Sequence, residues 1–160
     1  MDDEVQLSSD GLTHVVRVGE TVRRPWRDYT PTVHAYLEHL WGAGITFVPK
    51  PLGKDDRERE VLSFVPGDIP MPPLPSWATD DQALVEIAGL IRQLHDAADG
   101  WEPPAEAVWG TLPGAIVRGE SIDDSPTLVS HSDYCPGNVV FREQRPAAFI
   151  ASISPDQRRE

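Results

Sequence analysis

The stretch that decides the fold is His131-Ser132-Asp133-Tyr134-Cys135-Pro136-Gly137-Asn138. Apolar runs at 127–129 and 139–141 flank it, which predicts a polar loop between two strands. Within the loop, the carboxylate of Asp133 can accept a proton, and the amide oxygen of Asn138 can supply one ligand to a magnesium ion. Asp, Pro, Gly and Asn are also ordinary turn residues, so the bare spacing leaves a plain turn open.

With His131, Gly137 and both flanking strands in place, the loop resembles the His-x-Asp-x-x-x-x-Asn catalytic loop of kinases. Together with the apolar run at 147–150, it resembles the aminoglycoside phosphotransferase family in particular. That family has Gly where this chain has Ser132, which is a mild departure. The resemblance implies an ATP-dependent phosphotransferase acting on a small-molecule hydroxyl, with a nucleotide and a small-molecule acceptor as partners and with ATP and Mg²⁺ as cofactors.

The fold that the resemblance implies is α+β and protein-kinase-like. It combines a small antiparallel-sheet lobe with a helical large lobe, which is incomplete in this chain. The break at Pro66-Gly67 then corresponds to the hinge between them. We therefore expect an N-terminal nucleotide-binding lobe at 1–67 and a partial C-terminal lobe at 68–160.

In the large lobe, the resemblance assigns roles to four residues. Asp133 is the expected catalytic base or hydroxyl orienter, and Asn138 is the expected metal ligand. His131 supports the loop by bonding its backbone, and His95 supports it from the helix beneath. Neither histidine is expected to transfer protons.

In the small lobe, the turn between the first two strands is expected to present backbone N–H groups to phosphate. Ser9 and Gly11 lie in that turn, although an ordinary hairpin turn explains them equally well. A basic side chain on the third strand is expected to contact the α and β phosphates. Arg23 is the preferred residue and Arg24 the alternative, because adjacent strand residues point to opposite faces.

The adenine is expected to lie against backbone groups of Ser63 and Val65, in the strand before the hinge. Kinases orient the basic residue of the third strand with a helix glutamate, and this helix has no carboxylate at the matching early position. Glu38 or His34 can substitute, and a solvated helix face explains both residues as well.

Local patterns predict the elements of the small lobe. Strands at 5–7, 14–18 and 21–24 form a three-strand meander. Thr30 followed by Pro31 starts a helix that continues to Gly42. After the apolar pair at 47–48 comes a charged turn at 54–59, and then a strand at 61–65.

A proline-rich linker at 69–75 leads into the second helix. Thr79 or Asp80 is its expected N-cap, and Gly100 is its expected end. Apolar residues recur on one face of this helix, at Leu84, Ile87, Ile91 and Leu94.

The second metal-binding Asp of the family has no counterpart, because Ala151 follows the strand at 147–150. Under one choice of codons, restoring a single nucleotide in the Ala151 codon gives Ile-Asp-Phe-Asp-Phe-Ala, the family's metal-binding segment. Our hypothesis is that a one-base deletion shortened the chain. Its activity is therefore uncertain, and a non-catalytic remnant or pseudokinase with residual nucleotide binding is the alternative.

A third interpretation is a thiol or metal hydrolase that uses Cys135 and His131. A thiol nucleophile needs a dedicated base and oxyanion donors, and a metal cluster there lacks a fourth ligand nearby. We rank it last.

Composition excludes several classes of protein. The 26 acidic and 14 basic residues give a formal net charge of −12, which disfavours nucleic acid as a partner. No run approaches the roughly 18 continuous apolar residues of a membrane span, and Met1-Asp2-Asp3-Glu4 does not resemble a signal peptide. The single cysteine excludes an internal disulfide. We expect a cytoplasmic protein with no membrane partner.

Overall fold

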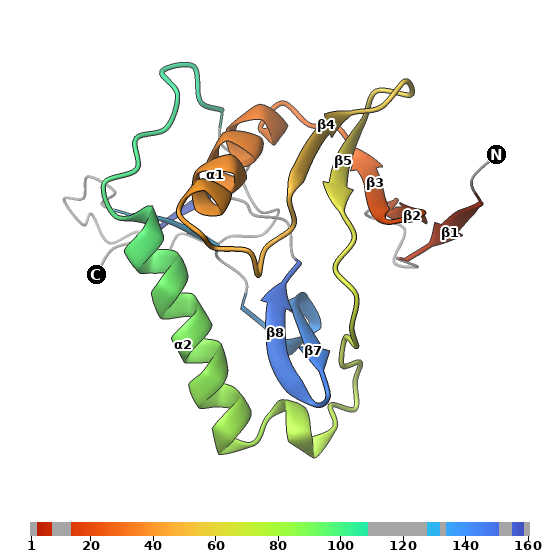
Figure 1. Cartoon of the computed structure of the whole chain (residues 1–160), viewed down its shortest axis with the longest axis vertical. Coiled ribbons are helices and arrows are strands. Elements are labelled where there is room, and N and C mark those ends of the chain that lie inside the picture. The colour runs from red at the N-terminus through yellow and green to blue at the C-terminus, as the bar shows by residue number, and fades with distance from the viewer. Residues whose placement is uncertain (1–2, 8–13, 109–127, 132–133, 151–154, 159–160) are drawn as a thin grey trace, which may run out of the picture.

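The computed structural model describes residues 3–7, 14–108, 128–131, 134–150 and 155–158. Over these residues the chain combines a five-stranded antiparallel sheet, two α-helices and two smaller two-stranded sheets, as Figure 1 shows. The predicted α+β class is confirmed. The expected protein-kinase-like arrangement of two lobes is not confirmed by these elements.

The five-stranded sheet has the order β1-β2-β3-β5-β4, and every neighbouring pair is antiparallel. Its strands are β1 (Glu4–Gln6), β2 (Val16–Val18), β3 (Thr21–Pro25), β4 (Pro51–Lys54) and β5 (Arg59–Ser63). The predicted meander is therefore confirmed as β1, β2 and β3. β5 lies two residues earlier than the strand predicted at 61–65, because the chain leaves the sheet at Phe64. The Phe64 N–H donates to the carbonyl of Glu20 at 2.9 Å.

Helix α1 (Thr30–Gly42) begins at the predicted Thr-Pro start and covers one face of this sheet. Val33, Leu37 and Leu40 recur at helical spacing and are at most 1% exposed, which explains why this segment forms a helix against the core. Gly44 ends the turn after the helix with a positive φ of 86°, a conformation that favours glycine.

Helix α2 (Asp81–Ala98) begins at the predicted N-cap. The Asp80 carboxylate accepts a hydrogen bond from the Ala83 N–H at 2.7 Å. The expected apolar face is wrong at one position, since Leu84 is 51% exposed and Ala83 is fully buried. Successive residues lie roughly 100° apart around a helix, so packing Ala83 and Ile87 inward turns Leu84 away.

The predicted strands at 139–141 and 147–150 form a hairpin of β7 (Val139–Arg142) and β8 (Arg145–Phe149). Its two turn residues, Glu143 and Gln144, have φ of 50° and 61°, as a tight antiparallel hairpin requires. A separate pair joins β6 (Leu128–His131) to β9 (Pro155–Arg158), and the sequence did not predict β9. Short 3₁₀ turns cover Ser76–Ala78 and Pro136–Asn138.

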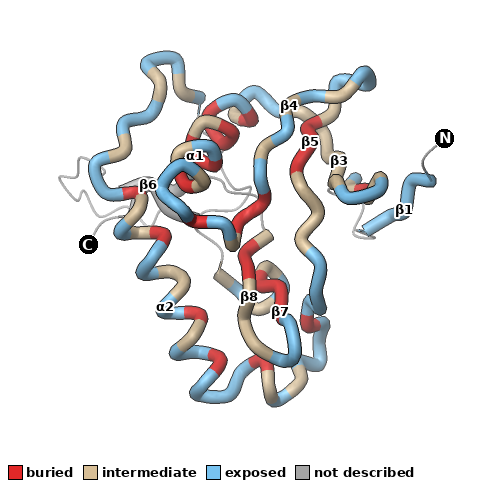
Figure 2. Tube along the Cα trace, in the orientation of Figure 1, coloured by how far each residue is buried: buried red, intermediate tan, exposed pale blue. Residues whose placement is uncertain are grey.

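The core lies where α1, α2 and the β7–β8 hairpin meet, and Figure 2 shows the buried positions on their inward sides. Phe141 and Phe149 of the hairpin are at most 2% exposed. Backbone bonds fix both edges of the hairpin. Asp68 and Phe141 exchange two bonds of 2.8 Å, and the Phe149 N–H donates to Phe47 at 2.9 Å. Among the described helices, none is long and apolar enough to cross a membrane.

Candidate binding pocket

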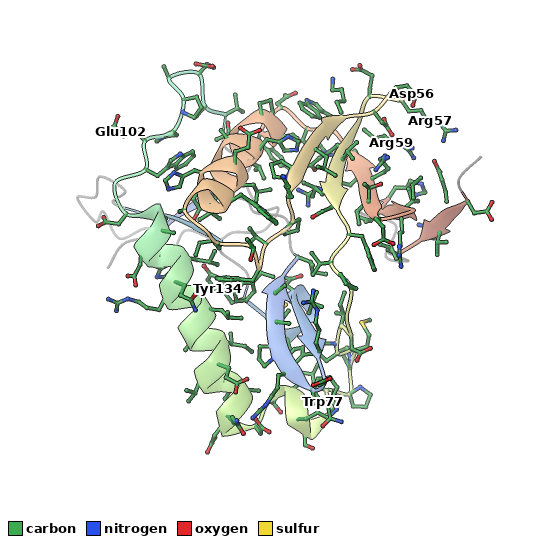
Figure 3. All side chains as sticks on the ribbon, viewed as in Figure 1. Asp56, Arg57, Arg59, Trp77, Glu102 and Tyr134 are labelled. Carbon is green, nitrogen blue, oxygen red and sulfur yellow. The ribbon has the colours of Figure 1, made fainter. Side chains whose placement is uncertain are left out.

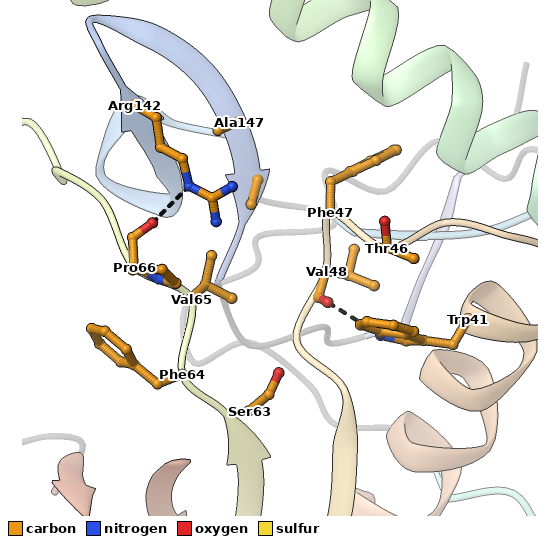
Figure 4. A pocket seen from close by; sticks show the side chains of 11 residues that line it. Trp41, Thr46, Phe47, Val48, Ser63, Phe64, Val65, Pro66, Arg142 and Ala147 are labelled. Carbon is orange, nitrogen blue, oxygen red and sulfur yellow. Dashed lines mark hydrogen bonds between the residues drawn. The ribbon is translucent and has the colours of Figure 1, made fainter. Parts of the chain in front are cut away.

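A pocket of about 260 Å³ opens where the five-stranded sheet meets the β7–β8 hairpin (Figure 4). Its 11 lining residues come from four parts of the chain. These are Trp41 near the end of α1, the loop at 46–48, the segment at 63–66 that follows β5, and the hairpin residues Arg142, Ala147 and Ala148.

Hydrogen bonds fix the walls of this pocket. The Trp41 indole N–H donates to the Val48 carbonyl at 3.2 Å, which ties α1 to the loop. Ser63 and Lys50 exchange two bonds, from the Ser63 N–H to the Lys50 carbonyl at 2.9 Å and from the Lys50 N–H to the Ser63 hydroxyl at 2.8 Å. The pocket is therefore formed in the free protein.

Arg142 is the one charged side chain among the pocket-lining residues. Its Nε donates to the Pro66 carbonyl oxygen at 3.0 Å, which joins the hairpin to the segment after β5. No ion pair joins Arg142 to the part of the chain that the structure describes, whereas Arg145 on the same hairpin lies 3.6 Å from the Glu86 carboxylate. Arg142 was not singled out by the sequence, because its partner is a main-chain carbonyl 76 residues away.

Two of the expected nucleotide contacts, Ser63 and Val65, lie together in the pocket lining. Arg23 lies elsewhere, with its Nε 3.3 Å from Asp55 Oδ2. The same carboxylate oxygen accepts from the Arg59 Nε at 2.9 Å. Arg23 thus belongs to a charge-paired group beside the β4–β5 turn, and Figure 3 labels Arg59 there.

Arg24 points to the other face of the sheet, toward α1, as the alternation along a strand predicts. It makes an ion pair with Glu60, its cross-strand neighbour on β5, and His34 Nε2 of α1 lies 3.0 Å from the same carboxylate. Glu60 is 1% exposed. Of the two candidate partners, His34 joins this cluster and Glu38 is exposed on the helix surface.

The environment of Glu60 lowers the pKa of its carboxyl. Burial alone raises this pKa, but the hydrogen bonds and positive charge from His34 and Arg24 outweigh burial and favour the ionised form. No sequence pattern used above singled out Glu60. The available signal was a carboxylate directly before the apolar pair Val61-Leu62. Glu60 lies two residues before Leu62, so the two side chains point to the same face of the strand, and both are buried.

The eight-residue loop is described only in part. Tyr134 packs beside α2, as Figure 3 shows, with its ring centroid 6.5 Å from that of His95. Asn138 lies in the 3₁₀ turn, where its N–H donates to the Cys135 carbonyl at 2.9 Å and its carbonyl accepts from Ile150 at 3.0 Å. Support of the loop by His95 and metal ligation by Asn138 stay predictions.

The other predicted loop residues lie outside the described residues or are described only by their backbone. Ser9, Gly11 and Asp133 are outside, and His131 is described only as a strand position opposite Pro155. Cys135 is exposed. Across the described ranges, no group of three or more His, Cys, Asp or Glu side chains is arranged to hold a metal ion.

A comparison with curated proteins found a relative for nearly the whole chain. The chain is 31% identical over 152 residues to a trifolitoxin immunity protein from Rhizobium leguminosarum bv. trifolii. The alignment covers 94% of this chain and 55% of the relative, so the chain spans about half the length of the relative. A scan against models of known protein families found no match.

These findings contradict the predicted membership of the aminoglycoside phosphotransferase family, because the relative is an immunity protein and no family model supports a kinase. The predicted phosphotransferase function is contradicted with it, and the non-catalytic pseudokinase alternative is not supported. Nothing supports ATP binding or magnesium as features of the chain. The kinase prediction rested on loop residues of types that also build plain turns. Residues 136–138 form such a turn, a short 3₁₀ turn.

Proposed function

We propose that this chain is an immunity protein that protects a cell against trifolitoxin. The observation that carries the proposal is the 31% identity to a trifolitoxin immunity protein over 94% of the chain. An alignment of this extent includes both helices and the hairpin. The likeness therefore extends far beyond a short motif.

Binding of the toxin is the means of protection that the geometry supports best. Hydrogen bonds between separate segments hold the walls of the pocket, so a ligand need not order these walls before it binds. The described residues also bring backbone groups of the segment at 63–66 to the pocket, together with one arginine. Protection then follows from a lower concentration of free toxin.

We also propose that the sheet with α1 and the hairpin with α2 form two lobes of a protein-kinase-like fold, at 1–67 and 68–160. The chain order supports this arrangement, with sheet, helix, strand pair, linker, helix and hairpin following one another. A fold of this kind carries no particular activity, because function resides in the site.

The experiment is a growth assay in a bacterium that is sensitive to trifolitoxin. Cells that express this chain, the full-length relative, or an empty vector are grown across a toxin dilution series. We expect this chain to raise the minimal inhibitory concentration several-fold over the vector. An unchanged inhibitory concentration, with the chain accumulating as folded protein at the level of the relative, overturns the proposal.

A matched control addresses the difference in length. The relative is cut down to the segment that aligns with this chain and expressed in the same strain. If both short chains protect, the protective function lies within the 152 aligned residues. If the cut relative protects and this chain does not, sequence differences within the aligned region abolish the function, and the proposal fails for this chain.

A further inference from the structure

The chemistry of the pocket lining indicates a class of ligand. Arg142 supplies the one positive charge among the 11 lining residues, and none of them is acidic. We propose that the pocket binds a small organic carboxylate, with the carboxylate on the Arg142 guanidinium and an apolar body against Val65. This inference rests on the pocket alone, so it stands or fails independently of protection against a toxin.

The position of Arg142 favours recognition of an anion. Its Nε is used by the Pro66 carbonyl at 3.0 Å, which holds the guanidinium at the pocket wall, and Figure 4 shows the group directed over the pocket. Guanidinium has five N–H donors, so one bond to Pro66 leaves donors for a carboxylate. The described residues offer no carboxylate ion pair that competes for them.

Within the pocket, Arg142 outweighs the negative charge of the whole protein. A formal net charge of −12 attracts cations to the surface and repels anions. Interactions between exposed charges are screened beyond about 8 Å at physiological ionic strength, so within the pocket the nearest charge dominates. Arg142 is that charge, and a cationic analogue of the same shape is expected to bind poorly.

The remaining walls leave room for a compact body. Val65 comes from the segment after β5, and Figure 4 shows its side chain beside the pocket, whereas Val48 of the loop after α1 is only 2% exposed and packs in the core. Ala147 and Ala148 of β8 add small side chains that leave room. The volume of about 260 Å³ corresponds to roughly nine water molecules at about 30 Å³ each, enough for a bicyclic acid.

The probe is indole-3-acetate, with indole-3-ethanol as its neutral analogue and tryptamine as its cationic analogue. Binding is followed by titration with ¹H–¹⁵N spectra of the labelled protein at physiological ionic strength. We expect indole-3-acetate to saturate shifts at Ser63, Val65 and Ala148 and to bind roughly tenfold or more tightly than either analogue. Equal affinity for the three probes, shifts outside the pocket, or no saturable binding overturns the proposal.

Two variants test the role of Arg142. Arg142→Gln is expected to lose about tenfold or more in affinity for indole-3-acetate and to leave the weak binding of indole-3-ethanol unchanged. Arg145→Gln is the matched control on the same hairpin, and it should bind indole-3-acetate like the unmodified protein. Unchanged affinity in Arg142→Gln, or an equal loss in both variants, contradicts the assignment.

A third variant covers the case in which Arg142→Gln does not fold, since Arg142 also contacts Pro66. Val65→Phe narrows the pocket at the segment after β5 and leaves Arg142 in place. We expect it to reduce binding of indole-3-acetate and of indole-3-ethanol together. Undiminished binding by folded Val65→Phe overturns the placement of the ligand in this pocket.

Discussion

A Cβ atom on Gly67 would lie 2.4 Å from Cγ1 of Val140 and 2.6 Å from the carbonyl oxygen of Phe141. Gly67 also has a positive φ of 146°, a conformation that side-chain-bearing residues rarely adopt. The segment after β5 therefore approaches the hairpin closely enough that only glycine fits. This contact lies beside the Asp68–Phe141 bridge, so it helps to fix the sheet relative to the hairpin.

We predict that Gly67→Ala destabilises the protein by at least about 2 kcal/mol, because the new methyl group clashes with backbone and the φ is unfavourable. Denaturant unfolding at equilibrium measures the change. Gly89→Ala is the matched control, since Gly89 lies in α2 with no atom within 4 Å of an added Cβ. It should stabilise by about 0.5–1 kcal/mol. Equal effects of the two substitutions contradict this account.

The example of Gly67 shows which parts of the fold the sequence can predict. The Pro66-Gly67 break is local, and its position after a strand was predicted correctly. The close contact with Val140 depends on a hairpin more than 70 residues later, so no local pattern reveals it. The meander, α1 and the N-cap at Asp80 were likewise predictable, because each rests on short-range periodicity or capping.

The candidate site was predictable only in part, for the same reason. Ser63 and Val65 were placed near a ligand from their position before the break, and both line the pocket. Arg142 and Glu60 were missed because their partners are distant in sequence, at Pro66 for the first and at Arg24 and His34 for the second. The loop at 131–138 matched a motif whose spacing a turn also satisfies, and the functional assignment drawn from it was wrong.

We predict that Glu60→Ala costs about 3–5 kcal/mol of stability, because it leaves the largely buried Arg24 without its counter-charge. Urea denaturation at neutral pH measures this loss. Glu38→Gln on the exposed surface of α1 is the control, and it should change stability by less than about 0.5 kcal/mol. A cost for Glu60→Ala as small as that of the control contradicts a stabilising role for the cluster.

The lowered pKa of Glu60 also predicts a pH dependence of stability. A carboxyl with a lower pKa in the folded state contributes stability above the unfolded value, which is near 4.5. That contribution is lost as the pH falls below about 4.5 through the lower, folded-state pKa. Glu60→Gln should flatten the stability profile in this acidic range. An identical acidic slope in both proteins excludes Glu60 as the cause.

The N-cap of α2 gives a further prediction. Asp80→Ala removes the acceptor for the Ala83 N–H and should cost about 1 kcal/mol. Asp80→Asn retains an acceptor oxygen and should cost only a few tenths of a kcal/mol. Thermal unfolding monitored at the helical circular-dichroism band compares the two variants. Equal loss in both indicates that the charge at the start of the helix, and not the cap, provides the stabilisation.

The last prediction concerns Phe141, which joins the hairpin to the linker. Its side chain is fully buried, and its ring packs edge-on against Trp77 with centroids 5.1 Å apart. Figure 3 labels Trp77 in the short turn before α2. Phe141→Ala should cost about 3–5 kcal/mol, because it opens a cavity among atoms that cannot collapse fully.

Two comparisons make the Phe141 prediction specific. Phe141→Leu keeps most of the volume and should cost about half as much or less. Leu84→Ala removes an apolar side chain of α2 that is 51% exposed, and it should change stability by less than about 0.5 kcal/mol. Equilibrium unfolding of the three variants, with Trp fluorescence and circular dichroism recorded together, tests this order. If Phe141→Ala melts the hairpin alone, the two signals separate. We expect them to coincide, because Phe141 and Phe149 belong to the same core cluster as Leu37 and Leu94.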